Sequence, residues 1–134
     1  MKFNAKKLTE NDYDLLVEWW KWWRWTPVPR NFLPDNGTGG IMIYKDNIPV
    51  VAGFIYFTNS DAAVVEWVIS NPEYKESDRK DAITLLIQAV EHVLAQQGIK
   101  HIFTIGRNKH LINVHKKLGW DVDKNPSYEI IKNL

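Results

Sequence analysis

The alternation of apolar and polar positions predicts a run of antiparallel strands in the first half of the chain. Residues 2–8 indicate a short edge strand, and apolar runs at 41–44, 50–58 and 62–70 indicate three more. Turn-forming residues separate the last three runs, so these are expected to pair as consecutive hairpins.

Two helices are predicted around these strands. The first has Thr9 as its N-cap and acidic residues in its first turn, and Pro27 limits it to about Trp25. Ser77 is expected to cap the second helix, which closes at Gly98. An apolar stripe on the second helix is expected to pack on the sheet; it comprises Ile83, Leu86, Ile87, Val90, Val93 and Leu94.

The last quarter of the chain predicts a strand, a helix and a final strand. Residues 101–105 read as the first strand, and Asp121 begins the final extended region. Between them, Asn108 is a good N-cap, and Gly119 suits the left-handed residue that ends a helix. Four residues share one face of this helix: Leu111, Val114, His115 and Leu118.

Composition narrows the function classes. The chain has 134 residues and no cysteine, and the lack of cysteine excludes disulfides, thiolate metal sites and cysteine nucleophiles. Its net charge of +1 gives no strong electrostatic footprint for nucleic acid or a membrane surface. The histidines at 92, 101 and 110 have no ligand-like spacing with carboxylates, so no metal site is predicted. Lacking a signal-like start and a bilayer-length apolar run, the protein is expected to be cytoplasmic.

The C-terminal pattern resembles the last strand–helix–strand unit of the GNAT acyltransferase superfamily. The matching positions are Asn108, Leu111, Val114, His115, Gly119 and Trp120. The segment Pro49–Gly53 is similar to the family's third strand, and the order of elements matches along the whole chain. The resemblance implies one α+β domain over residues 1–134, with a mostly antiparallel twisted sheet flanked by helices. It also implies transfer of an acetyl group from acetyl-CoA to an amine.

The resemblance places a donor site at the splayed end of the fourth strand. There the family pairs its main chain with the pantetheine arm of coenzyme A, which here would involve Val68, Ile69 and Ser70. Asn108 matches a family residue that contacts the cofactor, and it serves as a helix cap with or without that contact.

The segment expected to hold the cofactor's pyrophosphate departs from the family pattern. The family uses a glycine-rich loop at a helix N-terminus, whereas residues 75–82 contain no glycine. Side chains would have to replace the missing backbone cradle, and the candidate cofactor-binding residues are Arg79, Lys80, Asp81 and Ala82. The alternative is a plain helix start with acidic capping residues. The resemblance therefore specifies the fold better than the cofactor.

Two residues are candidates for the chemistry. Glu66 lies inside an apolar strand, six residues before Pro72, where many GNAT enzymes carry a carboxylate that acts as the base or orients a water molecule. The alternative is a glutamate on the exposed face of the strand. His115 replaces the family's tyrosine, which protonates the leaving thiolate, and imidazole can do the same near neutral pH. The alternative is a core histidine bonded to a carbonyl group.

The first helix carries a dense block of tryptophans. Leu15, Leu16, Trp19, Trp22 and Trp23 are predicted to form its core face. Trp20 and Trp25 flank that face and are predicted to be partly exposed. With Arg30 they are candidates to bind an aromatic or heterocyclic acceptor, including a nucleobase. The alternative is a tryptophan-rich core edge or a dimer surface.

The sequence thus predicts an N-acyltransferase acting on a small-molecule or macromolecular amine. The alternative is a degenerate GNAT-fold protein that does not use acetyl-CoA: a binding or partner protein, or a transferase with another acyl donor or a nucleobase target. The tryptophan-rich helix together with residues 56–60 and 66–72 resembles short GNAT-like proteins of tailed bacteriophages, which implies the host cytoplasm. Many GNAT proteins also dimerise.

Overall fold

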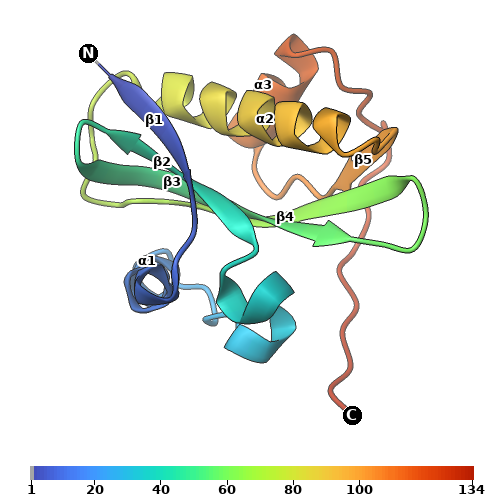
Figure 1. Ribbon diagram of the computed structural model, residues 1–134, viewed down its shortest axis with the longest axis horizontal. Coiled ribbons are helices and arrows are strands. Elements are labelled where there is room, and N and C mark those ends of the chain that lie inside the picture. The colour runs from blue at the N-terminus through green and yellow to red at the C-terminus, as the bar shows by residue number, and fades with distance from the viewer. Residues whose placement is uncertain (1) are drawn as a thin grey trace.

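The computed structural model describes residues 2–134. In this part of the chain five strands form one sheet, with helices on both faces (Figure 1). The strands are β1 (Phe3–Lys7), β2 (Gly40–Lys45), β3 (Ile48–Phe57), β4 (Ala62–Ser70) and β5 (His101–Thr104). The α-helices are α1 (Tyr13–Trp22), α2 (Arg79–Gln96) and α3 (Lys109–Lys117), and 3-10 turns cover Glu10–Asp12, Arg30–Phe32 and Pro34–Gly37.

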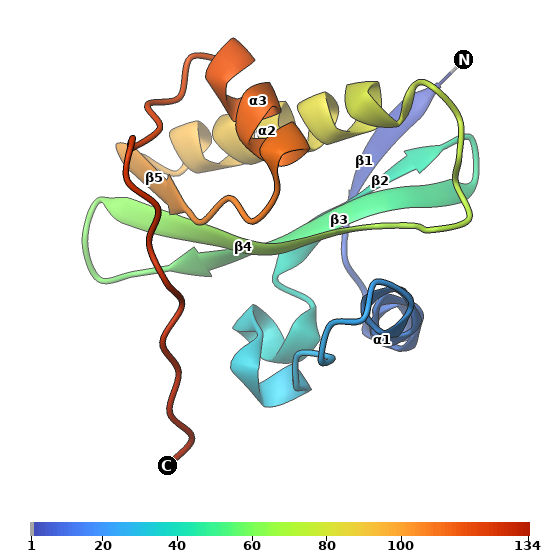
Figure 2. The ribbon, with the colours of Figure 1, turned by 180° about the vertical axis from the view of Figure 1, so that it is seen from behind.

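The strands lie in the order β1-β2-β3-β4-β5. The first three pairs are antiparallel, and β4 and β5 are parallel. The helices α2 and α3 cover one face, and α1 with the neighbouring 3-10 turns covers the other (Figure 1, and from behind in Figure 2). The predicted α+β fold with a mostly antiparallel sheet is confirmed. None of the helices in residues 2–134 combines the length and the hydropathy needed to span a bilayer.

Each face of the sheet has its own apolar core. Under α2, five of the six residues of the predicted stripe are buried and Val93 is half-buried. The helix begins after Asp78 rather than Ser77 and ends, as predicted, just before the left-handed Gly98. On the other face, Leu16, Trp19 and Trp20 of α1 pack with Phe54 of β3. The two cores fix α1 and α2 on opposite faces of the sheet.

The predicted core face of α1 is partly wrong. Trp20 is fully buried, and it stacks on Phe54 with ring centroids 6.3 Å apart. Trp22 and Trp23, predicted to be core, are 57% and 38% exposed. Because apolar residues occupy several faces of this short helix, periodicity alone does not decide which face turns towards the sheet. The contact with Phe54 at the centre of β3 fixes it instead.

The first helix ends three residues earlier than predicted. Arg24 takes a left-handed conformation (φ 64°), its N–H bonds to the Lys21 carbonyl, and the Trp25 N–H bonds to the Trp20 carbonyl. This is the Schellman arrangement, which favours glycine at the left-handed position. A non-glycine residue pays a steric cost there.

Replacing Arg24 with glycine is expected to raise the free energy of unfolding by about 0.5–1 kcal/mol. Relief of left-handed strain contributes about 1–2 kcal/mol, and the greater freedom of glycine in the unfolded chain offsets part of it. Urea denaturation measures the change. Arg24→Ala removes the same charge but keeps the Cβ atom, so it should not raise the free energy of unfolding. An equal rise in both variants would show that the lost charge, and not the relief of strain, is the cause.

The predicted final strand is absent: residues 121–134 contain neither helix nor strand. The carboxylate of Asp123 accepts a bond from the Asn125 N–H, which turns the chain, and Pro126 has no N–H to donate to a ladder. The segment 121–134, here called the C-terminal tail, leaves α3 and runs past the sheet towards the α1 side (Figure 2). It therefore brings tail residues next to β4.

Candidate functional site

The sheet opens between β4 and β5. Their parallel pairing runs from Ala62–His101 to Val65–Thr104 and stops there. The hydroxyl of Thr104 donates to the Val65 carbonyl (2.6 Å) at this last pair. Beyond it, β4 continues for five residues while the chain after Thr104 leaves the sheet. The result is a cleft beside the second half of β4.

A bulge in β4 lies at the start of this cleft. Phe54 is paired with Glu66 and Ala52 with Ile69, so Trp67 and Val68 together face Gly53. Trp67 has a φ of 60°, an unusual conformation for a bulky residue. The bulge re-aims the main chain and side chains of β4 at the cleft.

Register decides which main-chain groups of β4 face the cleft. The Asn71 N–H bonds to the Val50 carbonyl, so Asn71 and, by alternation, Ile69 turn their polar groups towards β3. The Ser70 carbonyl points the other way and accepts a bond from the Trp23 indole N–H (2.9 Å). The assignment of Ile69 to pantetheine pairing is therefore wrong, whereas Val68 and Ser70 keep suitable orientations.

Glu66 is buried at the mouth of the cleft, with 8% of its surface exposed. Its carboxylate accepts two bonds from the Arg107 guanidinium (2.7 and 3.3 Å) and one from the Ile105 N–H (3.3 Å). The alternative of a glutamate on an exposed strand face is thereby excluded. The strand supplies the carboxylate, and the loop between β5 and α3 supplies its cation.

Arg107 links this carboxylate to the C-terminal tail. It bonds to Glu129 of the tail (2.6 Å), and its guanidinium lies 4.8 Å from the centre of the Trp67 ring. Burial alone would lower the pKa of Arg107, but the bonds to Glu66 and Glu129 outweigh it and raise the pKa, so the group stays charged. Sequence reasoning gave Arg107 and Glu129 no role, because 22 residues separate them and no motif joins them.

Two pockets meet at Glu66. One lies in the cleft and has a volume of about 10 Å³; the other has about 310 Å³. The cleft pocket is lined by Trp25, Glu66, Trp67, Val68, Thr104, Ile105, Arg107, Asn108 and Leu111. The larger pocket is lined by Phe32, Tyr56, Val64, Glu66, Trp67, Glu129 and Ile131. Glu66 and Trp67 line both, so this carboxylate stands between a narrow cleft and a roomier pocket.

Aromatic residues form a bonded wall in the larger pocket. The Trp67 indole N–H donates to the Tyr56 hydroxyl (2.8 Å), which donates to the Phe32 carbonyl (2.9 Å). The rings of Phe32 and Trp67 meet edge to face at 5.7 Å. Burial and, to a lesser extent, the Glu66 carboxylate raise the pKa of Tyr56, so its hydroxyl stays protonated. The polar atoms of this wall are already paired, and its apolar surfaces line the pocket.

Asn108 and His115 lie on α3. The Asn108 side chain accepts a bond from the Leu111 N–H (2.8 Å), which confirms the predicted cap, and Asn108 also lines the cleft pocket. His115 is buried, with Nδ1 2.8 Å from the Leu111 carbonyl oxygen and its ring against Trp120. It lines neither pocket described here. This geometry matches the alternative of a core histidine bonded to a carbonyl group.

The start of α2 is closed by its own chain. The Arg79 guanidinium donates to the carbonyls of Asn71 (3.2 Å) and Tyr74, so the expectation that it grips phosphate is wrong for this arrangement. The main-chain N–H groups of Arg79 and Asp81 bond to the carbonyls three residues before them, those of Glu76 and Asp78. Ala82 is buried against the sheet, and Lys80 and Asp81 are exposed. Without glycines, this turn tightens into a helix start and forms no open cradle.

An ion pair fixes the same end of α2 to the sheet. Asp78 bonds to Lys45 of β2 (2.6 Å) and to the Tyr74 hydroxyl (2.5 Å). The bond to Lys45 and, to a lesser extent, the bond to Tyr74 lower the pKa of Asp78 below its ordinary value of 3.8. The segment that the resemblance implies for the pyrophosphate is thereby fixed to the sheet.

The pair predicts an acid-sensitive contribution to stability. Because the folded-state pKa of Asp78 is depressed, the contribution is present above pH 3.8 and is lost as the pH falls below that value. Asp78→Asn should therefore lower the free energy of unfolding at pH 7 and lose much of this effect near pH 3. Urea denaturation at both values measures it. Asp81→Asn removes a charge from the same helix end, and an equal pH dependence there would contradict the assignment.

The tryptophan-helix candidates fall in different places. Trp20 is fully buried, so its predicted exposure is wrong and it forms no wall of an acceptor pocket. Trp25 is half-buried, as predicted, and lines the cleft pocket instead. Arg30 lies over the Tyr13 ring at 4.3 Å and lines neither pocket described here. Phe32, Tyr56 and Trp67 line the larger pocket instead.

Solved N-acetyltransferases share this fold. The ribosomal-protein-S18-alanine N-acetyltransferase of Escherichia coli superposes with a TM-score of 0.69 at 13% identity, over 88% of this chain and 77% of that one. A probable acetyltransferase of Staphylococcus epidermidis gives 0.68 at 15% identity, over 88% and 83%. No protein-family model matches the chain, and no curated protein matches it in sequence. The chain has the GNAT fold of these proteins.

A third structure was solved with ligands. It is the N-acetylglutamate synthase of Neisseria gonorrhoeae complexed with coenzyme A and N-acetyl-glutamate, with a TM-score of 0.67 and 10% identity. The match covers 87% of this chain and 28% of the synthase, so this chain corresponds to about a quarter of that enzyme.

Proposed function

We propose that the protein is an N-acyltransferase that moves an acetyl group from coenzyme A to a primary amine. The observation that carries this proposal is the position of Glu66, which lines both the cleft beside β4 and the larger pocket. Direct transfer needs a donor site and an acceptor site that meet at a group able to take a proton. A buried carboxylate between two pockets on a GNAT fold satisfies that need.

The donor half of the site fits the cofactor in part. Val68 lines the cleft, where the amides of a pantetheine arm can pair with its main chain as a strand would, and Ser70 turns its carbonyl to the same side of β4. Pairing at the Ser70 carbonyl has to displace the Trp23 indole that bonds to it. The start of α2 does not fit a pyrophosphate cradle, because Arg79 and the first N–H groups bond within the chain. Exposed lysines at 75 and 80 are the remaining groups for phosphate, so we expect weak donor binding that depends on salt.

The acceptor half uses the larger pocket. An amine placed there has its nitrogen beside Glu66. An amine that arrives as ammonium first releases one proton through this carboxylate to water and becomes nucleophilic, and the second proton passes to Glu66 as the C–N bond forms. Coenzyme A supplies the activated acyl group as a thioester. The C–S bond breaks, and the leaving thiolate takes its proton from water, since thiolates are stable enough near neutral pH to depart without an acid. His115, bonded to a carbonyl group inside α3, is assigned a structural role.

A second candidate function has its own support. The cleft pocket has a volume of only about 10 Å³, and the Ser70 carbonyl already accepts a hydrogen bond from the Trp23 indole N–H. A chain that had lost its cofactor while keeping the fold would show such a filled cleft. This candidate is a binding protein that uses the larger pocket without coenzyme A.

Calorimetric titration with acetyl-CoA and with coenzyme A separates the two candidates. The proposal expects binding in the micromolar to millimolar range that weakens as salt rises, and release of free thiol when a mixture of primary amines is added. Lys80→Ala should weaken donor binding, and Lys100→Ala, at the far end of α2, should not. Absence of both binding and thiol release at millimolar acetyl-CoA would reject the transferase and favour the second candidate.

A further inference from the structure

The larger pocket has walls of one chemical kind. Five of its seven lining residues present apolar or aromatic surface: Phe32, Tyr56, Val64, Trp67 and Ile131. The polar atoms of Tyr56 and Trp67 bond to each other and to a carbonyl group. A polyhydroxylated or highly charged occupant would thus find few partners there, and a buried polar group without a partner is costly.

The charged side chains lining the pocket are both carboxylates, Glu66 and Glu129. They share one cation, Arg107, which bonds to both. Two negative groups against one positive group leave one negative charge at the end of an apolar pocket. A single positive charge on the occupant balances it.

We infer that the acceptor is a small primary amine, protonated on arrival, that carries a single aromatic or branched apolar body. This inference rests on the proposed function and names its substrate class. The ammonium group lies against Glu66 and Glu129, and the body packs on Phe32, Trp67 and Ile131. A volume of about 310 Å³ is at the lower end of the usual range for small-ligand pockets, which suits one ring rather than a chain of sugars.

The C-terminal tail is then the element that selects the acceptor. It provides one carboxylate, Glu129, and one apolar wall, Ile131, of the same pocket. Both come from a segment that belongs to no helix or strand, so they can change without disturbing the sheet.

Binding measured without an acyl donor tests the inference. Phenethylamine, its neutral analogue phenethyl alcohol and the diamine putrescine are titrated into the protein, and the shifts of the tryptophan indole signals are followed by NMR. Phenethylamine is expected to bind at least ten times more tightly than either other compound. Equal affinity for putrescine would overturn the apolar body, and equal affinity for the alcohol would overturn the charge.

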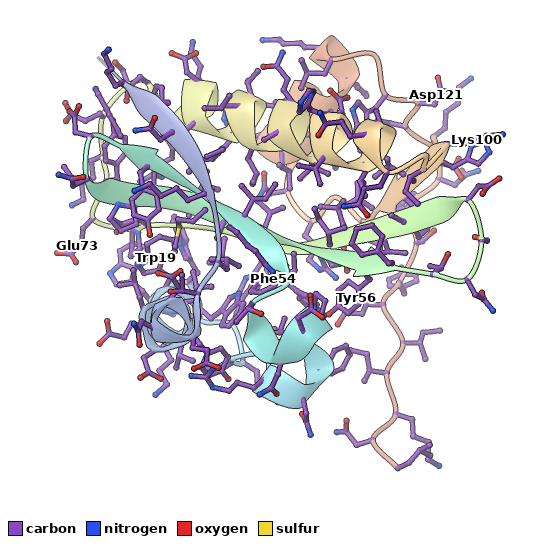
Figure 3. The ribbon with its side chains drawn as sticks, in the orientation of Figure 1. Trp19, Phe54, Tyr56, Glu73, Lys100 and Asp121 are labelled. Carbon is purple, nitrogen blue, oxygen red and sulfur yellow. The ribbon has the colours of Figure 1, made fainter. Side chains whose placement is uncertain are left out.

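A matched pair of variants locates the site. Glu129→Gln should weaken phenethylamine binding about tenfold and leave phenethyl alcohol unchanged, because only the ammonium group loses a partner. Glu73→Gln removes a carboxylate at the opposite end of the sheet from Tyr56 (Figure 3) and should change neither affinity. No effect of Glu129→Gln, or no binding of phenethylamine at tens of millimolar, would overturn the inference.

The outcome is separable from that of the proposed function. If acetyl-CoA does not bind, the amine affinities remain as expected and only the transferase proposal fails. If thiol is released with hydrophilic amines and not with phenethylamine, the transferase proposal stands and the assigned acceptor class fails.

Discussion

Replacing Glu66 with glutamine is expected to lower the rate of acyl transfer by about 10²–10⁴-fold, the usual contribution of a positioned general base. Glutamine keeps the shape and one acceptor oxygen but cannot take a proton from the amine. The loss should appear in kcat, while the affinity for the donor stays nearly constant, because Val68 and Ser70 rather than Glu66 provide the main-chain edge for the donor.

The Glu66→Gln substitution leaves the site's other groups with partners. Arg107 keeps its bond to Glu129, so no buried cation is stranded. The Ile105 N–H can still donate to the amide oxygen of glutamine. A fall in kcat with little change in the free energy of unfolding would therefore report chemistry and not misfolding.

Thiol release with acetyl-CoA and a saturating amine measures the effect, and Glu73→Gln is the matched control that should retain full activity. His115→Phe sharpens the test: it should lower stability because the bond to the Leu111 carbonyl is lost, yet leave kcat within a few-fold. If Glu66→Gln retained normal kcat, or if His115→Phe abolished transfer in a folded protein, the assignment of roles would be wrong.

The sequence predicted most of the fold because local signals agreed with one another. The strand 62–70 was predicted with its exact bounds, and the Asn108 cap and the left-handed Gly119 of α3 were both confirmed. Apolar alternation, turn residues and caps act over a few residues, so they can be read from one chain. The prediction of a final strand failed because it took no account of the Asx turn at Asp123 or of the partner strand that a ladder needs.

The site was harder to predict because it is built from distant residues. Glu66 was identified as a charge within an apolar strand, but its partners lie 41 residues away at Arg107 and, through it, in the C-terminal tail. The aromatic wall joins Phe32, Tyr56 and Trp67 from three separate elements. Such pairings depend on strand order and register, which periodicity does not contain.

Periodicity also failed to place the tryptophans of α1, because the contact that buries Trp20 comes from β3. Deleting this buried side chain is expected to have the largest effect on stability. Trp20→Ala should lower the free energy of unfolding by about 3–5 kcal/mol, the usual cost of deleting a large buried aromatic side chain. Trp20 has no exposed surface, stacks on Phe54 and meets the Tyr13 ring edge to face. Since single domains of this size have about 5–15 kcal/mol in total, the variant should unfold at much lower urea concentrations.

Two further variants separate core packing from ligand binding. Trp22→Ala removes a side chain that is 57% exposed and should cost well under 1 kcal/mol. Trp20→Phe should cost less than Trp20→Ala, since it keeps most of the apolar volume and removes an indole N–H that has no partner among the described residues. It should leave phenethylamine affinity unchanged, whereas a Trp20 that lined the acceptor pocket would change that affinity in a protein that is still folded.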